Sequence, residues 1–125
     1  MARILIVDDV MSIREIVCSM LQKKGHRVFE AKTGEEAIAI AKTKRVHLVL
    51  TDINMPVMDG IQMIHQLRQI EHYAKTPIVV LAKGAKDENI EKARAAGAID
   101  WIAKPFTEDS LVSKVNQLLV DYYVN

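Results

Sequence analysis

Three carboxylates follow short apolar runs in the sequence. Asp8 and Asp9 come directly after RILIV at residues 3–7, and Asp52 comes directly after HLVLT at residues 47–51. Runs of this length, bounded by polar residues, are typical of buried β-strands. Ligands of open α/β sheets bind beyond the carboxyl ends of the strands, where the direction of winding reverses. If the two strands are neighbours, the three acids therefore share one shallow pocket.

A pocket with three carboxylates needs either protons or a cation, because like charges at short range repel strongly. Ligands that are all oxygen favour a hard cation, and a few carboxylates with room for water suit Mg²⁺ better than Ca²⁺. Such a cation would also attract an anionic substrate, and a phosphoryl group fits this description. The carboxylate free to attack phosphorus would be Asp52, which would give an acyl phosphate.

A lysine near the end of the chain could complete this chemistry. Lys104 lies in AKPF, at the end of the last apolar run, and would add a positive charge at the phosphoryl oxygens. Pro105 would fix the direction of the lysine, for which a cis peptide bond is one means. Each motif alone is weak, since a strand-end Asp such as Asp52 is often only a helix cap. Together, at three strand ends, they are much more specific.

The elements that could position these residues alternate along the whole chain. Five apolar runs are predicted strands, and five segments with helical spacing lie between and after them. Strict alternation predicts βαβ units, and hence an α/β fold: a (βα)5, doubly wound, parallel five-stranded sheet with helices on both faces. The predicted strands are 3–7, 27–31, 47–51, 77–82 and 99–103. The helices are predicted over residues 13–21, from Thr33, from Gly60, from Asp87 to Gly97 and after Thr107.

The apolar content of the strands predicts their places in the sheet. The first, third and fourth strands are almost continuously apolar, as strands buried on both faces are. The second and fifth strands are more polar and suit the edges. No repeat, low-complexity tract or linker divides the sequence, so we expect one domain over residues 1–125 with a single sizeable core.

Composition and charge limit the possible partners. Half of the residues are hydrophobic and 26% are charged, which is too apolar for a disordered chain. The formal net charge is +1, so no overall field attracts nucleic acid or an anionic membrane. No apolar run could span a membrane, and the N-terminus lacks the pattern of a secretion signal, so we expect a cytoplasmic protein. The lone Cys18, interpreted as a partly buried helix thiol, agrees with a reducing compartment.

The sequence resembles the receiver domain of two-component response regulators, and most closely the single-domain, CheY-like chemotaxis regulators. The similarity covers essentially all 125 residues and is carried by ILIVDD, DINMPVMDG, PIVVLA and ARAAGAIDWIAKPF. It implies the strand order 2-1-3-4-5 of that flavodoxin-like fold. It also implies a stand-alone, monomeric regulator that takes a phosphoryl group from a sensor histidine kinase and then changes its affinity for a protein partner.

The resemblance implies a role for each acid and for the lysine. Asp52 matches the phosphoacceptor, and Lys104 matches the lysine that contacts the phosphoryl group. Asp8 and Asp9 match the acids that bind Mg²⁺ with Asp52, and the backbone carbonyl of Asn54 matches a further metal ligand. The implied partner surface consists of the fourth helix, the fifth strand and the fifth helix. Phosphoryl transfer onto the chain itself is the only chemistry expected, so we do not expect an enzyme acting on an external substrate.

The end of the fourth predicted strand departs from the family pattern. Receivers usually have Thr or Ser there, followed by a small residue, whereas VVLAKG has Ala82 and Lys83. The missing hydroxyl would donate a hydrogen bond worth about 1.5 to 3 kcal/mol, and its loss would weaken the switch by about one or two powers of ten. Lys83 is either a substitute donor or a solvated lysine. Trp101 matches the switch aromatic of the family, the residue that turns inward when the hydroxyl residue moves. Because Ala82 replaces that hydroxyl residue, we interpret Trp101 as a half-buried packing residue.

Two other classes of function compete with the phosphorylation switch. A pseudo-receiver would have the same fold and bind a protein without phosphorylation, a possibility raised by Ala82. A flavin carrier or enzyme of flavodoxin-like fold is disfavoured, because flavin phosphate sites use hydroxyls and backbone amides where DDVMSI has acids. His47, His65 and His72 lack ligand spacing and are interpreted as surface or packed histidines.

Overall fold

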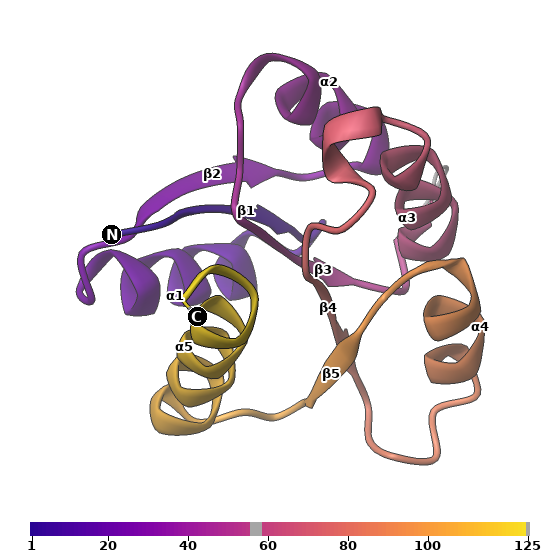
Figure 1. Cartoon of the computed structure of the whole chain (residues 1–125). Helices are drawn as coiled ribbons and strands as arrows, with labels where there is room; N and C mark the ends of the chain where they lie inside the picture. The colour runs from indigo at the N-terminus through magenta and orange to yellow at the C-terminus, as the bar shows by residue number, and fades with distance from the viewer. Residues whose placement is uncertain (56–58, 125) are drawn as a thin grey trace.

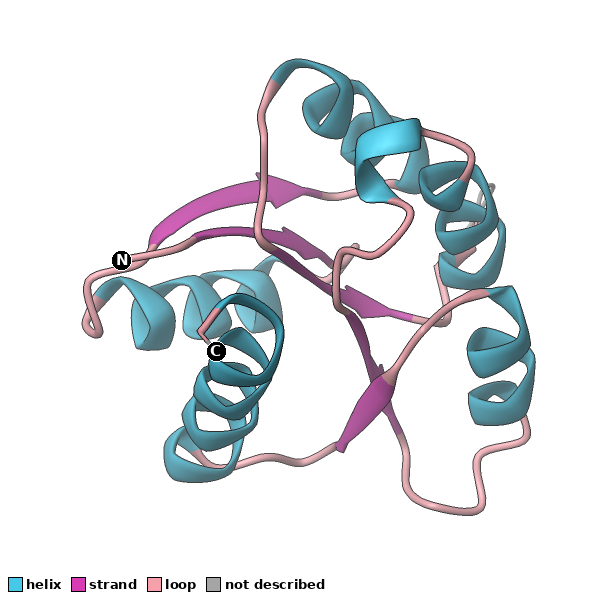
Figure 2. Ribbon diagram, in the orientation of Figure 1, coloured by secondary structure: helices cyan, strands magenta, loops and turns pink. Residues whose placement is uncertain are grey.

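The computed structural model of the chain contains one parallel β-sheet with helices on both faces (Figures 1 and 2). It describes residues 1–55 and 59–124. The strand order is β2-β1-β3-β4-β5, which confirms the predicted α/β fold and the order that the resemblance implies. The strands are β1 (Arg3–Val7), β2 (Arg27–Ala31), β3 (Leu48–Asp52), β4 (Ile78–Ala82) and β5 (Asp100–Ala103).

The helices divide between the two faces of the sheet. α1 and α5 cover one face, and α2, α3 and α4 cover the other (Figure 1). The winding reverses between β1 and β3, because α1 leads outward to β2 and α2 returns past β1 to β3. None of the described helices is long and apolar enough to cross a membrane. The helices are α1 (Met11–Gln22), α2 (Gly34–Thr43), α3 (Gly60–Arg68), the 3₁₀-helix η1 (Glu71–Tyr73), α4 (Asn89–Ala96) and α5 (Glu108–Tyr123).

Alternating side chains of the central strands fill two separate cores. In β1, Leu5 and Val7 belong to the core under α2, α3 and α4, whereas Ile4 and Ile6 belong to the core under α1 and α5. All residues of β3 and β4 are buried. Strands packed on both faces must be apolar throughout, which explains why the three most apolar runs occupy the centre and the two more polar runs the edges.

The ends of several elements differ from the predicted ends by one or two residues. β3 begins and ends one residue later than predicted, because Asp52 still pairs with Leu81 of β4. β4 begins at Ile78, since Pro77 has no N–H to donate to a neighbouring strand. α4 begins at Asn89 rather than near Asp87. The sequence pattern does not predict η1.

Arg68 fixes the end of α4 to the neighbouring elements. Its guanidinium donates hydrogen bonds of 2.6 Å to the carbonyl oxygens of Tyr73 and Gly97. Gly97 ends α4 with a φ of +128°, and a Cβ at this position would lie 2.7 Å from Nε of Arg68. Both the backbone conformation and the close approach therefore favour glycine. The C-terminal end of α4 is held against α3 and η1 by these contacts.

Two histidines hold the start of the first strand, at the end of the sheet opposite the acids. Nδ1 of His26 accepts the N–H of Ala2 at 3.1 Å, and Nδ1 of His47 accepts the N–H of Arg3 at 2.9 Å. An imidazole nitrogen that accepts a hydrogen bond must be unprotonated. Burial also lowers the pKa of both histidines below the ordinary value of 6.5. The folded chain therefore favours the neutral form of both side chains.

This preference predicts that acidification destabilises the fold. A histidine with a lowered folded-state pKa contributes stability that is complete above about pH 6.5 and is lost as the pH falls through the folded-state pKa, because the unfolded chain takes up the proton first. Urea unfolding at a series of pH values measures this loss. The double variant His26→Gln, His47→Gln should show a smaller loss than the wild type, and His65→Gln, at an exposed position on α3, should keep it. If the free energy of unfolding had the same pH dependence in the wild type and the double variant, the prediction would be contradicted.

Candidate functional site

The carboxyl ends of β1 and β3 bring three acidic side chains together. The two strands are hydrogen-bonded neighbours, Asp8 directly follows β1, and Asp52 is the last residue of β3. Carboxylate oxygens of Asp8, Asp9 and Asp52 lie within 4.8 Å of one another. The structure therefore places the three acids in one cluster, here called the acidic cluster, whose donor atoms are all oxygens.

Two of the three acids in the acidic cluster are buried, and their charges repel one another. Asp8 and Asp52 are 1% and 5% exposed, whereas Asp9 is exposed. Burial raises the pKa of the Asp8 carboxyl, and the charges of Asp52 and Asp9 raise it further. A hydrogen bond of 2.9 Å from the N–H of Val10 to the Asp8 carboxylate acts in the opposite direction. Oxygen donors under this mutual repulsion fit a hard divalent cation such as Mg²⁺.

Lys104 provides a cation at the edge of the acidic cluster. Its Nζ lies 3.2 Å from Oδ1 of Asp52, and the two side chains are 30% and 7% exposed. The N–H of Lys104 donates to the carbonyl oxygen of Ala82 at 2.7 Å, and the peptide bond to Pro105 is cis. The lysine backbone is thus held at the end of β5 beside β4. A phosphoryl group on Asp52 would lie next to this ammonium group.

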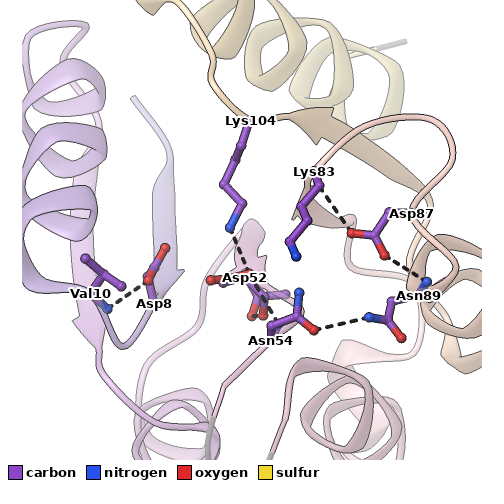
Figure 3. A network of polar contacts seen from close by, with 9 residues as sticks. Asp8, Val10, Asp52, Asn54, Lys83, Asp87, Asn89 and Lys104 are labelled. Carbon is purple, nitrogen blue, oxygen red and sulfur yellow. Dashed lines mark hydrogen bonds and ion pairs between the residues drawn. The ribbon is translucent and has the colours of Figure 1, made fainter.

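Polar contacts join the loops that follow β3 and β4 (Figure 3). The N–H of Asn54 donates to the Asp52 carboxylate at 3.2 Å, and the Asn54 side-chain oxygen accepts from Nδ2 of Asn89 at 3.1 Å. The Asp87 carboxylate accepts the N–H groups of Lys83 at 3.2 Å and Asn89 at 3.0 Å. These contacts link the predicted phosphoacceptor to the first residue of α4.

Asp87 and Asn89 are site residues that the sequence reasoning does not identify. Their spacing is that of an Asp whose carboxylate accepts the N–H two residues later, a local signal that could have predicted the Asp87–Asn89 bond. The contact between Asn54 and Asn89 joins residues far apart in the sequence. No local pattern predicts it, because it depends on how closely two loops approach.

The end of β4 combines a buried alanine with an exposed lysine. Ala82 is 1% exposed and pairs with Ala103 of β5. Because the residue is alanine, this position has no side-chain hydroxyl. Lys83 is exposed, and its side chain extends toward Asn54 and Asp52 beside that of Lys104 (Figure 3). Trp101 is partly buried on the edge strand β5, where it packs against the core under α2, α3 and α4.

Backbone contacts fix Asp52 in its position. The Thr51 hydroxyl donates to the carbonyl oxygen of Asp52 at 2.8 Å. Gly60 begins α3, and its N–H donates to the carbonyl oxygen of Ile53 at 2.9 Å. A Cβ on Gly60 would lie 2.4 Å from the Asp52 carbonyl oxygen and 2.8 Å from Cα of Ile53. Only glycine allows α3 to begin this close to the strand end.

The other reactive side chains considered in the sequence lie outside the acidic cluster. His65 and His72 are exposed on α3 and η1, and His47 lies at the opposite end of the sheet. The Cys18 sulfur lies 3.7 Å from the Glu30 carboxylate, and burial raises the pKa of the thiol. Within the part of the chain that the structure describes, the acidic cluster is the one group of three such side chains close enough to hold a metal ion.

Comparisons with known proteins agree with this geometry. The family model for the response regulator receiver domain matches residues 4–116. Protein PilH of Pseudomonas aeruginosa is 35% identical over 121 residues, which cover 95% of this chain and 98% of PilH. The structure of the chemotaxis response regulator CheY4 of Vibrio cholerae has a TM-score of 0.91 and 37% identity, over 95% of this chain and 99% of that one.

A third similar structure holds a metal ion. The receiver domain of a sensor histidine kinase from Pseudomonas aeruginosa, solved with a magnesium ion coordinated in its active-site cleft, has a TM-score of 0.84 and 28% identity. The match covers 97% of this chain and 96% of that one.

The contact between Gly60 and Asp52 predicts a cost for a single added methyl group. Gly60→Ala should lower the free energy of unfolding by about 1–3 kcal/mol, because backbone atoms of residues 52 and 53 must move to admit the Cβ. Gly84→Ala is the matched control, since no atom beyond residues 83–85 lies within 4 Å of its added Cβ. The free energy of unfolding of Gly84→Ala should differ from that of the wild type by no more than about 0.5 kcal/mol. Chemical denaturation measures both, and equal effects would contradict the role of the close contact.

Proposed function

Because the chain belongs to the response regulator receiver domain family, we propose that it acts as a switch controlled by phosphorylation of Asp52. The observation that carries the proposal is the convergence of Asp8, Asp9 and Lys104 on the Asp52 carboxylate. The phosphoryl donor is a phosphohistidine of a sensor kinase. Phosphorylation changes the affinity of the chain for a protein partner.

Phosphoryl transfer to Asp52 forms one bond to phosphorus and breaks another. A carboxylate oxygen of Asp52 attacks the phosphorus, and the P–N bond of the phosphohistidine breaks. The leaving imidazole keeps the electron pair and takes a proton from water. Lys104, at 3.2 Å from the nucleophilic carboxylate, stabilises the charge on the phosphoryl oxygens during transfer. The chain acts on itself and turns over no external substrate.

Asp8, Asp9, Asp52 and the backbone carbonyl of Asn54 would hold a Mg²⁺ ion. When bound, the ion supplies positive charge to the phosphoryl oxygens and reduces the repulsion among the acids. The all-oxygen donor set and the raised pKa of Asp8 support this assignment. The similar kinase receiver domain that holds a magnesium ion in its active-site cleft supports it as well.

Ala82 affects the read-out of phosphorylation rather than the transfer itself. The nucleophile, the acids and Lys104 are all present, so nothing required for attack on phosphorus is lost. A hydroxyl at residue 82 would add a hydrogen bond to the phosphoryl group. Without it, phosphorylation changes the equilibrium constant between the inactive and active conformations by about one or two powers of ten less. The switch is therefore weakened unless another side chain supplies the contact.

The protein partner binds the surface formed by α4, β5 and α5. Trp101 is partly exposed on this surface, and an ion pair of 2.9 Å between Asp100 and Lys114 joins β5 to α5. A rearrangement of the loop between β4 and α4 would reach this surface directly, because α4 forms part of it. The formal net charge of +1 gives no overall field that would attract nucleic acid, which favours a protein target.

A pseudo-receiver that binds its partner without phosphorylation is the second candidate, favoured by the alanine at residue 82. Partner capture in the presence and absence of beryllium fluoride, a stable mimic of the phosphoryl group on a carboxylate, separates the two candidates. A difference in recovery supports the phosphorylation switch. Equal recovery under both conditions supports the pseudo-receiver.

Incubation with Mg²⁺ and a small phosphodonor should add the mass of one phosphoryl group to the wild-type protein. The adduct should be absent from Asp52→Asn, which lacks the nucleophilic carboxylate, and should form more slowly in Lys104→Met, which lacks the neighbouring positive charge. Mass spectrometry of the intact protein makes both measurements. An unmodified wild type would contradict the proposed function, and an adduct on Asp52→Asn would show that another residue accepts the group.

A further inference from the structure

A second lysine faces the acidic cluster from the end of β4. Figure 3 shows the side chain of Lys83 extending toward Asn54 and Asp52, beside Lys104. Lys104 is paired with Asp52 at 3.2 Å, whereas Lys83 forms no ion pair with any residue in the described part of the chain. Both lysine charges also lower the pKa of Asp87, after the larger effect of the Asn89 N–H. Two ammonium groups thus lie at the same end of the sheet, and one of them is not engaged.

The charge of this second lysine matches the charge that phosphorylation would add. The three carboxylates of the acidic cluster are balanced by one divalent cation together with Lys104. Phosphorylation replaces the single negative charge of the Asp52 carboxylate with a phosphoryl group of about two negative charges at neutral pH. One further positive charge restores the balance. Lys83 is placed to provide this positive charge. Its ammonium group can also donate hydrogen bonds, whereas the buried side chain of Ala82 has no donor.

The backbone of Lys83 is connected to the start of α4. Its N–H donates to the Asp87 carboxylate at 3.2 Å, and the same carboxylate accepts the N–H of Asn89, the first residue of α4, at 3.0 Å. Asn89 in turn contacts the Asn54 side chain at 3.1 Å. A displacement of residue 83 toward Asp52 is therefore transmitted through Asp87 to the N-terminal end of α4.

We propose that Lys83 binds the phosphoryl group on Asp52 and thereby moves the loop at residues 83–88 and the start of α4. This role rests on the proposed phosphorylation of Asp52. It assigns Lys83 as a ligand of the phosphoryl oxygens in place of a side-chain hydroxyl at residue 82. The ammonium group of Lys83 binds the phosphoryl oxygens, and the backbone of Lys83 moves with it. This movement displaces the start of α4, which forms part of the surface that binds the partner.

Binding of beryllium fluoride in the presence of Mg²⁺, followed by fluorine NMR, tests the contact at equilibrium. Lys83→Met keeps the length of the side chain and the backbone N–H but removes the charge, and it should lower the affinity by about tenfold, the lower part of the range for a hydrogen bond between charged groups. Lys83→Arg should retain most of the affinity. Lys86→Met is the matched control, since Lys86 is an exposed lysine of the same loop, and its affinity should equal that of the wild type.

Amide hydrogen exchange of the same samples tests the transmission. Beryllium fluoride should change the protection of residues 83–89 in the wild type and in Lys86→Met, and the change should be absent or much smaller in Lys83→Met. Unchanged affinity and an unchanged loop response in Lys83→Met would overturn the role of Lys83 while leaving the phosphorylation of Asp52 in place. A wild type that neither binds beryllium fluoride nor gains a phosphoryl group would overturn the proposed function and this inference together.

Discussion

Repulsion among the carboxylates at the ends of β1 and β3 is the interaction on which the rest of the site depends. Buried neighbouring strands hold Asp8 and Asp52 in position, so the two acids cannot move apart. Each neighbouring group reduces this repulsion: the N–H of Val10 on Asp8, and the N–H of Asn54 and the ammonium of Lys104 on Asp52. In the proposed function, a divalent cation would reduce the repulsion further and a phosphoryl group would increase the negative charge, so the site would respond to phosphorylation.

The fold separates the parts that hold this charge from the parts that respond to it. β1, β3 and β4 are packed on both faces, and a close-packed core resists small displacements. The segments after β3 and β4 are instead joined by an exposed hydrogen bond between Asn54 and Asn89. Such contacts cost less to rearrange than a core does. Under the proposed function, a change of charge at the rigid strand ends would therefore move the loop before α4.

The sequence predicts the fold and the acidic cluster, because both follow from local patterns. Continuous apolar runs identify the central strands, and an acid directly after such a run must lie at the carboxyl edge of a parallel sheet. The approach of Gly60 to the Asp52 carbonyl and the direction of Lys83 leave no comparable signal. They depend on how loops from different strands pack, which neither periodicity nor composition determines. The strand order came from the family resemblance and is confirmed by the sheet pairing.

The hydrogen bonds of Arg68 fix the C-terminal end of α4 to the neighbouring elements. They hold the carbonyl of Gly97, where the helix ends. The first residue of the helix, Asn89, instead forms hydrogen bonds with Asp87 and with Asn54, which belong to the loops before α4 and after β3. If the loop at residues 83–88 moves as proposed, the fixed C-terminal end would make α4 tilt about Gly97 instead of sliding along the sheet. The C-terminal end of α4 would then act as a pivot, so the proposed movement of residue 83 would give its largest displacement at the first turn of the helix.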